Sequence, residues 1–135
     1  MARQDQVAAI PVRRGAKGRL EVLLVTTRET RRWVVPKGWP LPRRPDHEAA
    51  AVEAWEEAGV RGMVHSDPVG TFDYDKRQKS GSVPVRVSAY LMEVTEEAST
   101  WPEASQRKRA WFSAEEASEA VSEDGLKDLL RGLGR

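Results

Sequence analysis

Residues 36–60 read PKGWPLPRRPDHEAAAVEAWEEAGV, and this stretch decides the fold. Its first ten residues hold four prolines and Gly38, a composition that favours a loop. Pro45 suits the first position of a helix, and Gly59 suits the residue just past the end of one. The five alanines between them favour helix strongly. The stretch therefore predicts a loop, a helix over residues 45–58 and a second loop.

Three of the carboxylates on the predicted helix, those of Glu53, Glu56 and Glu57, stand at positions i, i+3 and i+4. At about 100° per residue they share one sector of an α-helix. Like charges at these spacings repel, and the last turn of a helix favours cations instead. A divalent cation such as Mg²⁺ or Mn²⁺, which prefers oxygen ligands, would remove both penalties. The alternative is an acidic helix face that is simply solvated.

Strand patterns lie on both sides of this helix. The apolar, β-prone run that precedes it is interrupted by Pro11, and a basic turn with two glycines joins it to a second run. Behind the helix, a region broken by Pro68 and Gly70 comes before the clearest alternating pattern of the chain. The predicted strands are 6–12, 20–27, 33–35, 63–74, 83–94 and 110–112, with turns or loops at 13–19, 36–45 and 76–82.

The chain closes with two predicted helices. Ser113 and Glu116 match a capping box, so a helix is expected from Ser113 to about Val121. A second amphipathic helix would bury the side chains of Leu126, Leu129, Leu130 and Leu133. The order of elements, which is strands, one helix, more strands and a final pair of helices, predicts an α/β (α+β) fold. We expect a mixed sheet covered on both faces, in one domain over residues 1–135.

The composition excludes several classes of protein. The chain has 135 residues, 22 Lys and Arg against 21 Asp and Glu, and a net charge of +1, which argues against nucleic-acid or membrane partners. It has no cysteine, so disulfides, thiolate metal sites and cysteine nucleophiles are excluded, and two histidines make a zinc site a poor fit. No apolar run has the length of a signal peptide or a spanning helix, so we expect a cytoplasmic protein.

The near-zero charge conceals a strong order along the chain. Residues 1–45 hold eleven basic and three acidic side chains, whereas residues 46–60 hold five acidic side chains and no Lys or Arg. A second acidic block, 93–105, is followed by Arg107-Lys108-Arg109. Such blocks suit a site that holds a metal on carboxylates and a polyphosphate on a basic surround, although balanced solvated faces would also produce them.

The central stretch resembles the Nudix box. The spacing of Gly38, Glu53, Glu56, Glu57, Gly59 and Val60 matches that motif throughout. Two positions depart from it, because Arg44 stands where the family has its first Glu and Val52 stands where the family has its Arg. In the family these two side chains commonly interact and help to orient the neighbouring glutamate. Their absence puts the orientation of Glu53 in question more than metal binding.

Outer segments extend the resemblance to the diphosphoinositol polyphosphate phosphohydrolase branch, which also includes diadenosine polyphosphate hydrolases. They are residues 31–36, the Phe72-Asp73-Tyr74 segment with its basic neighbours, and residues 107–117. The resemblance implies a Nudix-like α/β/α sandwich with a loop–helix–loop catalytic motif and C-terminal helices. It also implies a monomer or homodimer that cleaves a diphosphate linkage in an anionic, polyphosphorylated small molecule.

The resemblance also assigns roles. Glu53 would orient or deprotonate the attacking water, and Glu56 and Glu57 would be the main ligands of Mg²⁺ or Mn²⁺, with the Gly38 carbonyl. Two further roles come from the residues themselves. Trp39, in the loop, is hard to explain by packing and is expected to stack on a base or wall the site, and Arg44, which replaces an acid next to the metal helix, is expected to take up phosphate. The residues expected to bind substrate are Arg32, Lys37, Gly38, Trp39, Arg44, Lys76, Arg107 and Arg109.

Two other hypotheses remain open from the sequence. The chain could keep the Nudix chemistry and act on nucleoside triphosphates or nucleotide sugars. It could also be a ligand-binding Nudix domain that has lost turnover, because Arg44 and Val52 depart from the motif.

Overall fold

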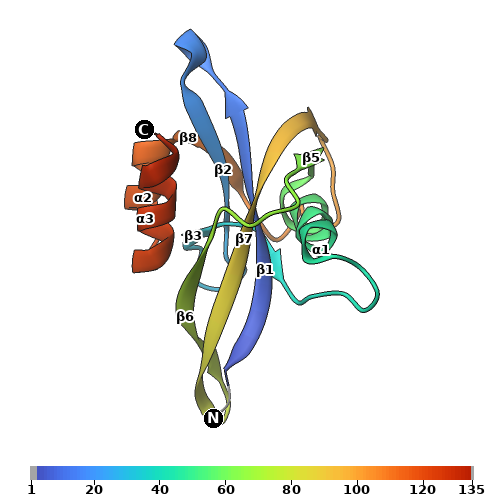
Figure 1. Cartoon of the computed structure of the whole chain (residues 1–135), viewed down its shortest axis with the longest axis vertical. Coiled ribbons are helices and arrows are strands. Elements are labelled where there is room, and N and C mark those ends of the chain that lie inside the picture. Colours follow the sequence, from blue (N-terminus) through green and yellow to red (C-terminus); the bar gives the residue numbers. More distant parts are fainter. Residues whose placement is uncertain (1–2, 135) are drawn as a thin grey trace.

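The computed structural model describes residues 3–134 as a large sheet with helices on both faces (Figure 1). The strands are β1 Gln4–Arg14, β2 Leu20–Thr26, β3 Trp33–Val34, β4 Lys37–Gly38, β5 Val60–Val64, β6 Gly70–Gln78, β7 Gly81–Glu97 and β8 Arg109–Ser113. The helices are α1 Asp46–Glu53, α2 Ala114–Ala120 and α3 Asp124–Leu133. A π-helical turn, Ala54–Ala58, continues α1, and a 3₁₀ turn, Ala16–Gly18, joins β1 to β2.

The eight strands form one mixed sheet. Its main path runs β3-β2-β1-β7-β5, while β4 pairs with β1, β6 with β7 and β8 with β2. The two central strands, β1 and β7, are parallel over the whole register from Gln4↔Val85 to Val12↔Glu93. All other pairs are antiparallel. The predicted mixed sheet is confirmed.

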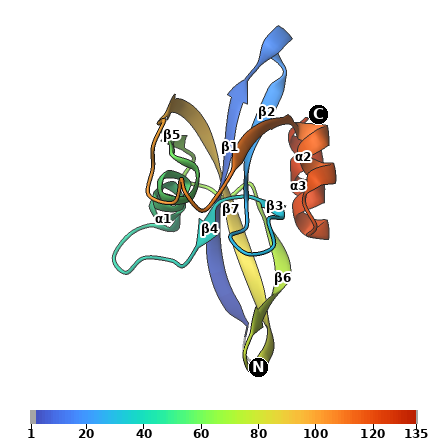
Figure 2. The same ribbon diagram turned by 180° about the vertical axis from the view of Figure 1, so that it is seen from behind.

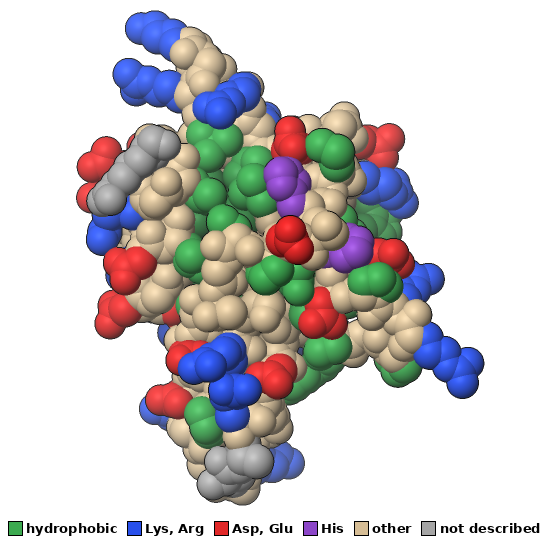
Figure 3. Space-filling model, viewed as in Figure 1, with side chains coloured by type: hydrophobic (Ala, Val, Ile, Leu, Met, Phe, Trp, Pro, Cys, Tyr) green, Lys and Arg blue, Asp and Glu red, His purple; other side chains and the backbone are tan. Residues whose placement is uncertain are grey.

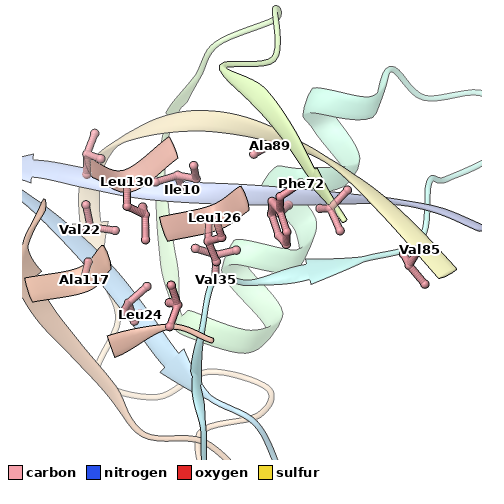
Figure 4. Close-up of a cluster of buried hydrophobic side chains, with 14 residues drawn as sticks. Ile10, Val22, Leu24, Val35, Phe72, Val85, Ala89, Ala117, Leu126 and Leu130 are labelled. Atoms are coloured by element: carbon pink, nitrogen blue, oxygen red, sulfur yellow. The ribbon is translucent and has the colours of Figure 1, made fainter. Parts of the chain in front are cut away.

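Alternate residues of the central strands build two separate cores. Ala8 and Ile10 of β1 face α2 and α3, together with Leu126 of α3, in the cluster of Figure 4. Val7 and Ala9, one position away, face the alanines of α1. Because successive strand residues point to opposite faces, a continuous apolar run is needed where both faces are covered. Figures 1 and 2 show α1 on one side and the α2–α3 pair on the other, and the predicted α/β/α sandwich is confirmed.

Strand β1 continues through Pro11, where the sequence predicted a break. Along β1, the backbone nitrogen of Ala9 donates to Pro36, so nitrogens of alternate residues, Pro11 included, point toward the β2 and β4 edge. That edge has a gap at Pro11, because β4 pairs at Val7 and Ala8 and β2 pairs only from Val12 onward. The missing N–H therefore removes no ladder hydrogen bond, which is where a strand tolerates proline.

Several predicted boundaries also differ, and the region predicted as one strand over 63–74 is divided between β5 and β6. Residues 76–78 belong to β6 and residues 81–82 to β7, so the hairpin loop predicted at 76–82 is much tighter. Lys37 and Gly38 form the short strand β4 inside the predicted loop 36–45. Pro45 precedes α1 as its N-cap, and Asp46 is the first helical residue. Pairing with the distant strand β1 sets the bounds of β4, and pairing between β6 and β7 themselves shortens the hairpin loop.

The predicted C-terminal helices are confirmed. The Ser113 hydroxyl accepts from the Glu116 backbone N–H at 3.0 Å, and the Glu116 carboxylate accepts from the Ser113 N–H at 3.0 Å. In α3, Leu126 and Leu130 are fully buried, and Leu129 and Leu133 pack against the same core. In residues 3–134, no helix is both long and apolar enough to cross a membrane.

Basic side chains are spread over the molecule instead of forming one face. On the side seen in Figure 3, Lys and Arg gather at the tip of the β1–β2 hairpin and over the β6–β7 end, with acidic side chains between them. This distribution fits the small net charge of the chain. The binding of a charged ligand therefore depends on the local charge inside a cavity and not on the charge of one whole face.

Candidate functional site

A cavity of about 930 Å³ opens where β3, β4, β6 and the C-terminal end of α1 come together. Eight of the eleven residues predicted from the sequence line it. They are Arg32, Lys37, Gly38, Trp39, Glu53, Glu57, Lys76 and Arg107. Lining residues that the sequence reasoning did not single out include Gln6, Arg28, Tyr74, Glu103 and Glu123.

The carboxylate-bearing helix changes its winding at the site. Residues Ala54–Ala58 form a π-helical turn, and the Gly59 N–H reaches back to the Ala54 and Trp55 carbonyls. Gly59 ends the turn in the left-handed region, with φ at 69°, where glycine carries no Cβ penalty. The prediction of one shared sector assumed α-helical spacing, which this turn lacks. Glu53 and Glu57 line the cavity, and Glu56 does not.

Glu53 and Glu57 form a pair of carboxyl groups in a partly dry environment. Burial raises the pKa of Glu57 to about 8, against the lowering effect of the Arg107 charge, while the Glu53 charge raises it. Burial also raises the pKa of Glu53, although a hydrogen bond with Glu57 lowers it. Two carboxylates held together away from water favour protonation or the binding of a cation.

Glu57 is contacted from two sides. Its side chain is only 8 % exposed, and one oxygen lies 3.7 Å from Nη2 of Arg107. The other oxygen accepts from the Lys37 backbone N–H at 3.4 Å. Burial lowers the pKa of the Lys37 side chain, against the raising effect of the Glu123 and Glu57 charges. The Lys37 ammonium lies 5.1 Å from the ring centre of Tyr74.

The donor set fits a hard divalent cation in part. Glu53 and Glu57 supply oxygen ligands of the kind that Mg²⁺ takes, usually with waters and substrate phosphates. The space that a Cβ of Gly38 would need is taken by the Glu53 carboxylate, so backbone and carboxylate lie close together. Within residues 3–134, however, no three Asp, Glu, His or Cys side chains are gathered as a metal-binding group. The structure thus brings Glu53 and Glu57 together in the cavity lining, and Glu56 lies close enough for its charge to raise the pKa of Glu53.

Basic and aromatic side chains form the rim of the cavity. Arg28, Arg32, Lys76 and Arg77 line it on the side of the β2–β3 connection and β6. Trp39 is 45 % exposed, which is unusual for so large an apolar side chain. The Lys76 ammonium lies 4.5 Å from the Trp39 ring centre, within cation–π range.

Glu103 was missed by sequence reasoning, although it stands four residues before the basic run at 107–109. Its carboxylate accepts from Nε of Arg107 at 2.7 Å, and both side chains line the cavity. Their segment joins β7 to β8 and crosses the end of the carboxylate-bearing helix. A lone Glu in a connecting segment carries no local pattern, so only its position in the fold identifies it.

Two predicted substrate-binding residues lie outside the cavity lining. Arg109 donates to the Ala58 carbonyl at 2.8 Å and the Ala98 carbonyl at 2.6 Å, and it stacks on Trp101 at 4.0 Å. This guanidinium caps the helix that carries the carboxylates. Arg44 is exposed on the loop before α1 and is not part of the lining.

Comparison with known proteins agrees with this geometry. The family model described as the NUDIX domain matches residues 2–132. Nudix hydrolase 13, mitochondrial, from Arabidopsis thaliana is 33% identical over 122 residues, which cover 84% of this chain and 59% of that protein. Diphosphoinositol polyphosphate phosphohydrolase 3-beta from Homo sapiens is 37% identical over 100 residues, covering 72% and 57%. The chain thus spans less than two thirds of the length of these relatives.

A solved structure shares the fold over nearly the full length. The C. elegans Ap4A hydrolase binary complex superposes with a TM-score of 0.70 at 21% identity, covering 96% of this chain and 94% of that one. At this identity the likeness establishes the architecture alone. Together with the family match across almost every residue, it leads to one conclusion: the chain belongs to the Nudix family.

Proposed function

We propose that this protein is a metal-dependent pyrophosphohydrolase that cleaves a diphosphate linkage in a polyphosphorylated small molecule. The observation that carries the proposal is the pairing of half-buried Glu53 with buried Glu57 in the lining of a cavity with a basic rim. A polyphosphate needs both a cation near its reacting phosphorus and basic side chains along its other phosphates. The family match and the diphosphoinositol polyphosphate phosphohydrolase relative support the same activity.

Glu53 and Glu57, with the Gly38 carbonyl, would hold Mg²⁺ or Mn²⁺. The bound cation would neutralise phosphate oxygens and lower the pKa of a coordinated water. Glu53 is the better candidate to orient or accept a proton from that water, because it is the more accessible of the two carboxylates. Glu56, which lies outside the lining, stays in the proposal as an outer member of the ligand group.

The charges of the cavity favour a dinucleoside polyphosphate over a diphosphoinositol polyphosphate. Six basic side chains line it (Arg28, Arg32, Lys37, Lys76, Arg77 and Arg107), and six acidic ones offset them (Glu29, Glu53, Glu57, Asp75, Glu103 and Glu123). A divalent cation would balance Glu53 and Glu57, leaving six basic against four acidic side chains, a small surplus for an inositol that carries phosphate on every carbon. A dinucleoside polyphosphate carries fewer phosphates and brings bases that Trp39 could stack against.

The test is hydrolysis of a substrate panel with Mg²⁺ or Mn²⁺. Dinucleoside polyphosphates, diphosphoinositol polyphosphates, nucleoside triphosphates and nucleotide sugars should be compared at equal concentration. We expect turnover that a chelator abolishes and that Glu57→Gln lowers strongly, with Glu48→Gln, an exposed carboxylate of α1, as the matched control. Full activity in the presence of excess chelator would contradict the metal model.

The main alternative is a Nudix domain that binds a ligand without cleaving it. Arg44 and Val52 in place of the usual acidic and basic residues are the observation that favours it. It predicts a ligand-dependent rise in melting temperature with no phosphate released from any member of the panel. A cytoplasmic location also stays a prediction, since the similar Arabidopsis proteins are named as mitochondrial.

A further inference from the structure

Arg107 is the basic residue of the cavity lining whose guanidinium is held by the protein at all three of its nitrogens. Nε donates to Glu103 at 2.7 Å, Nη1 donates to the Thr26 carbonyl at 3.1 Å, and Nη2 lies 3.7 Å from Glu57. Only 10 % of the side chain is exposed. A guanidinium has five N–H donors in a fixed fork, and here every one of its three nitrogens has a protein partner.

The segment that carries Arg107 is fixed to the end of the carboxylate-bearing helix. The Glu103 N–H donates to the Glu56 carbonyl at 3.0 Å, and Nε1 of Trp101 donates to the Glu57 carbonyl at 2.9 Å. Arg109 takes the next carbonyl, that of Ala58, at 2.8 Å. These carbonyls belong to the last turn, which a helix leaves without partners of its own. Residues 98–109 therefore hold both the backbone and a side chain of the π-helical turn.

The geometry points to Arg107 as a positioning residue for Glu57. Glu57 has no basic neighbour within its own helix, because Val52 and the alanines around it carry no charge. Arg107, reaching across from the β7–β8 connection, supplies that charge, and Glu103 and Thr26 hold the guanidinium in place. Its role in this view is to fix the rotamer of Glu57 toward the cavity. This inference rests on the proposed function only in its kinetic part.

The alternative role for Arg107 is direct phosphate binding, as expected from sequence. Rim residues such as Arg32, an exposed arginine whose Nε donates to the Thr30 hydroxyl, are better placed for that. Removal of the Arg107 guanidinium would leave the buried Glu57 carboxyl, the Glu103 carboxylate and the Thr26 carbonyl without their shared partner, which is destabilising. Removal of Arg107 should therefore lower the stability of the ligand-free protein, and removal of Arg32 should not.

The first test is a double-mutant cycle on the melting temperature in the presence of a chelator, without substrate. Arg107→Met should lower the melting temperature by several degrees, and in the Glu57→Gln background the same change should cost about half as much or less. Arg32→Met, the matched control, should cost the same in both backgrounds. If Arg107→Met and Glu57→Gln are additive, the positioning role is overturned, whatever the activity of the enzyme.

The second test separates kcat from KM on the best substrate of the panel. Arg107→Lys keeps the charge but cannot bridge three partners, so we expect kcat to fall about tenfold or more with KM within about threefold of wild type. Glu103→Gln, which keeps Arg107 but loosens it, should lower kcat in the same direction. Arg32→Met should instead raise KM. A rise in KM alone for Arg107→Lys would make Arg107 a phosphate ligand and overturn the inference.

The two tests keep this inference distinct from the proposed function. If the wild-type protein cleaves nothing in the panel, the proposed function fails while the thermal cycle still measures the coupling of Arg107 to Glu57. If the wild-type protein is active and the cycle is additive, the proposed function stands and the positioning role fails.

Discussion

The Glu53 carboxylate lies directly against the backbone of Gly38. A Cβ atom on Gly38 would lie 2.8 Å from Oε2 of Glu53 and closer still to the rest of that carboxyl group. Glycine at this position therefore makes room for Glu53, and the reason is contact, since its backbone does not occupy the left-handed region. The contact joins β4 to the carboxylate-bearing helix and brings the Gly38 backbone against the group proposed to act on water.

Gly38→Ala should displace the Glu53 side chain with little loss of stability, because the end of a flexible side chain can move. We expect kcat to fall about tenfold or more, given the sensitivity of catalysis to misplacement on the order of 1 Å. The melting temperature should change by only a few degrees. Gly132→Ala is the matched control, since a Cβ there meets nothing and alanine favours a helix. Unchanged kcat in Gly38→Ala would contradict a role for Glu53.

Trp39 should matter for substrates that contain a base and not for those that lack one. Stacking of a base on an aromatic ring contributes about 1–3 kcal/mol, so Trp39→Ala should raise KM for a dinucleoside polyphosphate roughly 5- to 150-fold. Trp39→Phe should retain most of the affinity. Met63→Ala, an exposed apolar residue outside the cavity lining, serves as the control. An equal effect of Trp39→Ala on a diphosphoinositol polyphosphate would rule out base stacking as its role.

The metal-free protein should lose stability as the pH rises. Burial raises the pKa of Glu57 to about 8 in the folded state, from an ordinary value of 4.5. A carboxyl whose folded pKa is raised stabilises the fold most below its unfolded pKa and loses that contribution as the pH rises toward its folded pKa. The melting temperature in chelator should therefore fall between about pH 5 and about pH 8, which is roughly the range between these two pKa values.

Glu57→Gln should flatten this pH dependence, because glutamine does not ionise. Thermal melts of both proteins across the range, with and without Mg²⁺, measure the effect. Above about pH 8, the folded pKa of Glu57, added Mg²⁺ should raise the melting temperature of the wild type more than that of the variant. The Glu48→Gln protein should follow the wild type. A wild-type melting temperature that is constant over the range would contradict the buried, ionisable state of Glu57.

Arg109 should stabilise the fold and have little direct part in substrate binding. Arg109→Met removes charged hydrogen bonds to the Ala58 and Ala98 carbonyls, so we expect the free energy of unfolding to fall by roughly 2–3 kcal/mol. Denaturant unfolding measures this. Arg61→Met is the matched control, because Arg61 also stacks on a tryptophan, Trp55 at 3.6 Å, but is 56% exposed and should contribute much less. Equal losses in the two variants would contradict the capping role.

Local rules predicted the elements well wherever a short run of residues decides the outcome. The capping box at Ser113 and Glu116, the helix stop at Gly59 and the alternating pattern of β7 each depend on neighbours in sequence. Pro11 was misread as a break for the opposite reason. Whether a proline is tolerated depends on which neighbouring strand faces it, and that is set by the register of β2 and β4.

The residues of the candidate site fall into the same two groups, those predicted from local spacing and those placed only by the fold. The sequence alone determined that Gly38, Glu53 and Glu57 lie on adjoining loop and helix segments, because their spacing is local. Only the tertiary structure decided that Glu56 stays out of the cavity lining, that Arg107 and Glu103 join Glu57, and that Arg109 caps the helix instead of facing the cavity. The physical reason is that the π-helical turn takes its carbonyl partners from residues 98–109. Contacts between residues some fifty positions apart in the sequence are fixed by the packing of the whole sheet.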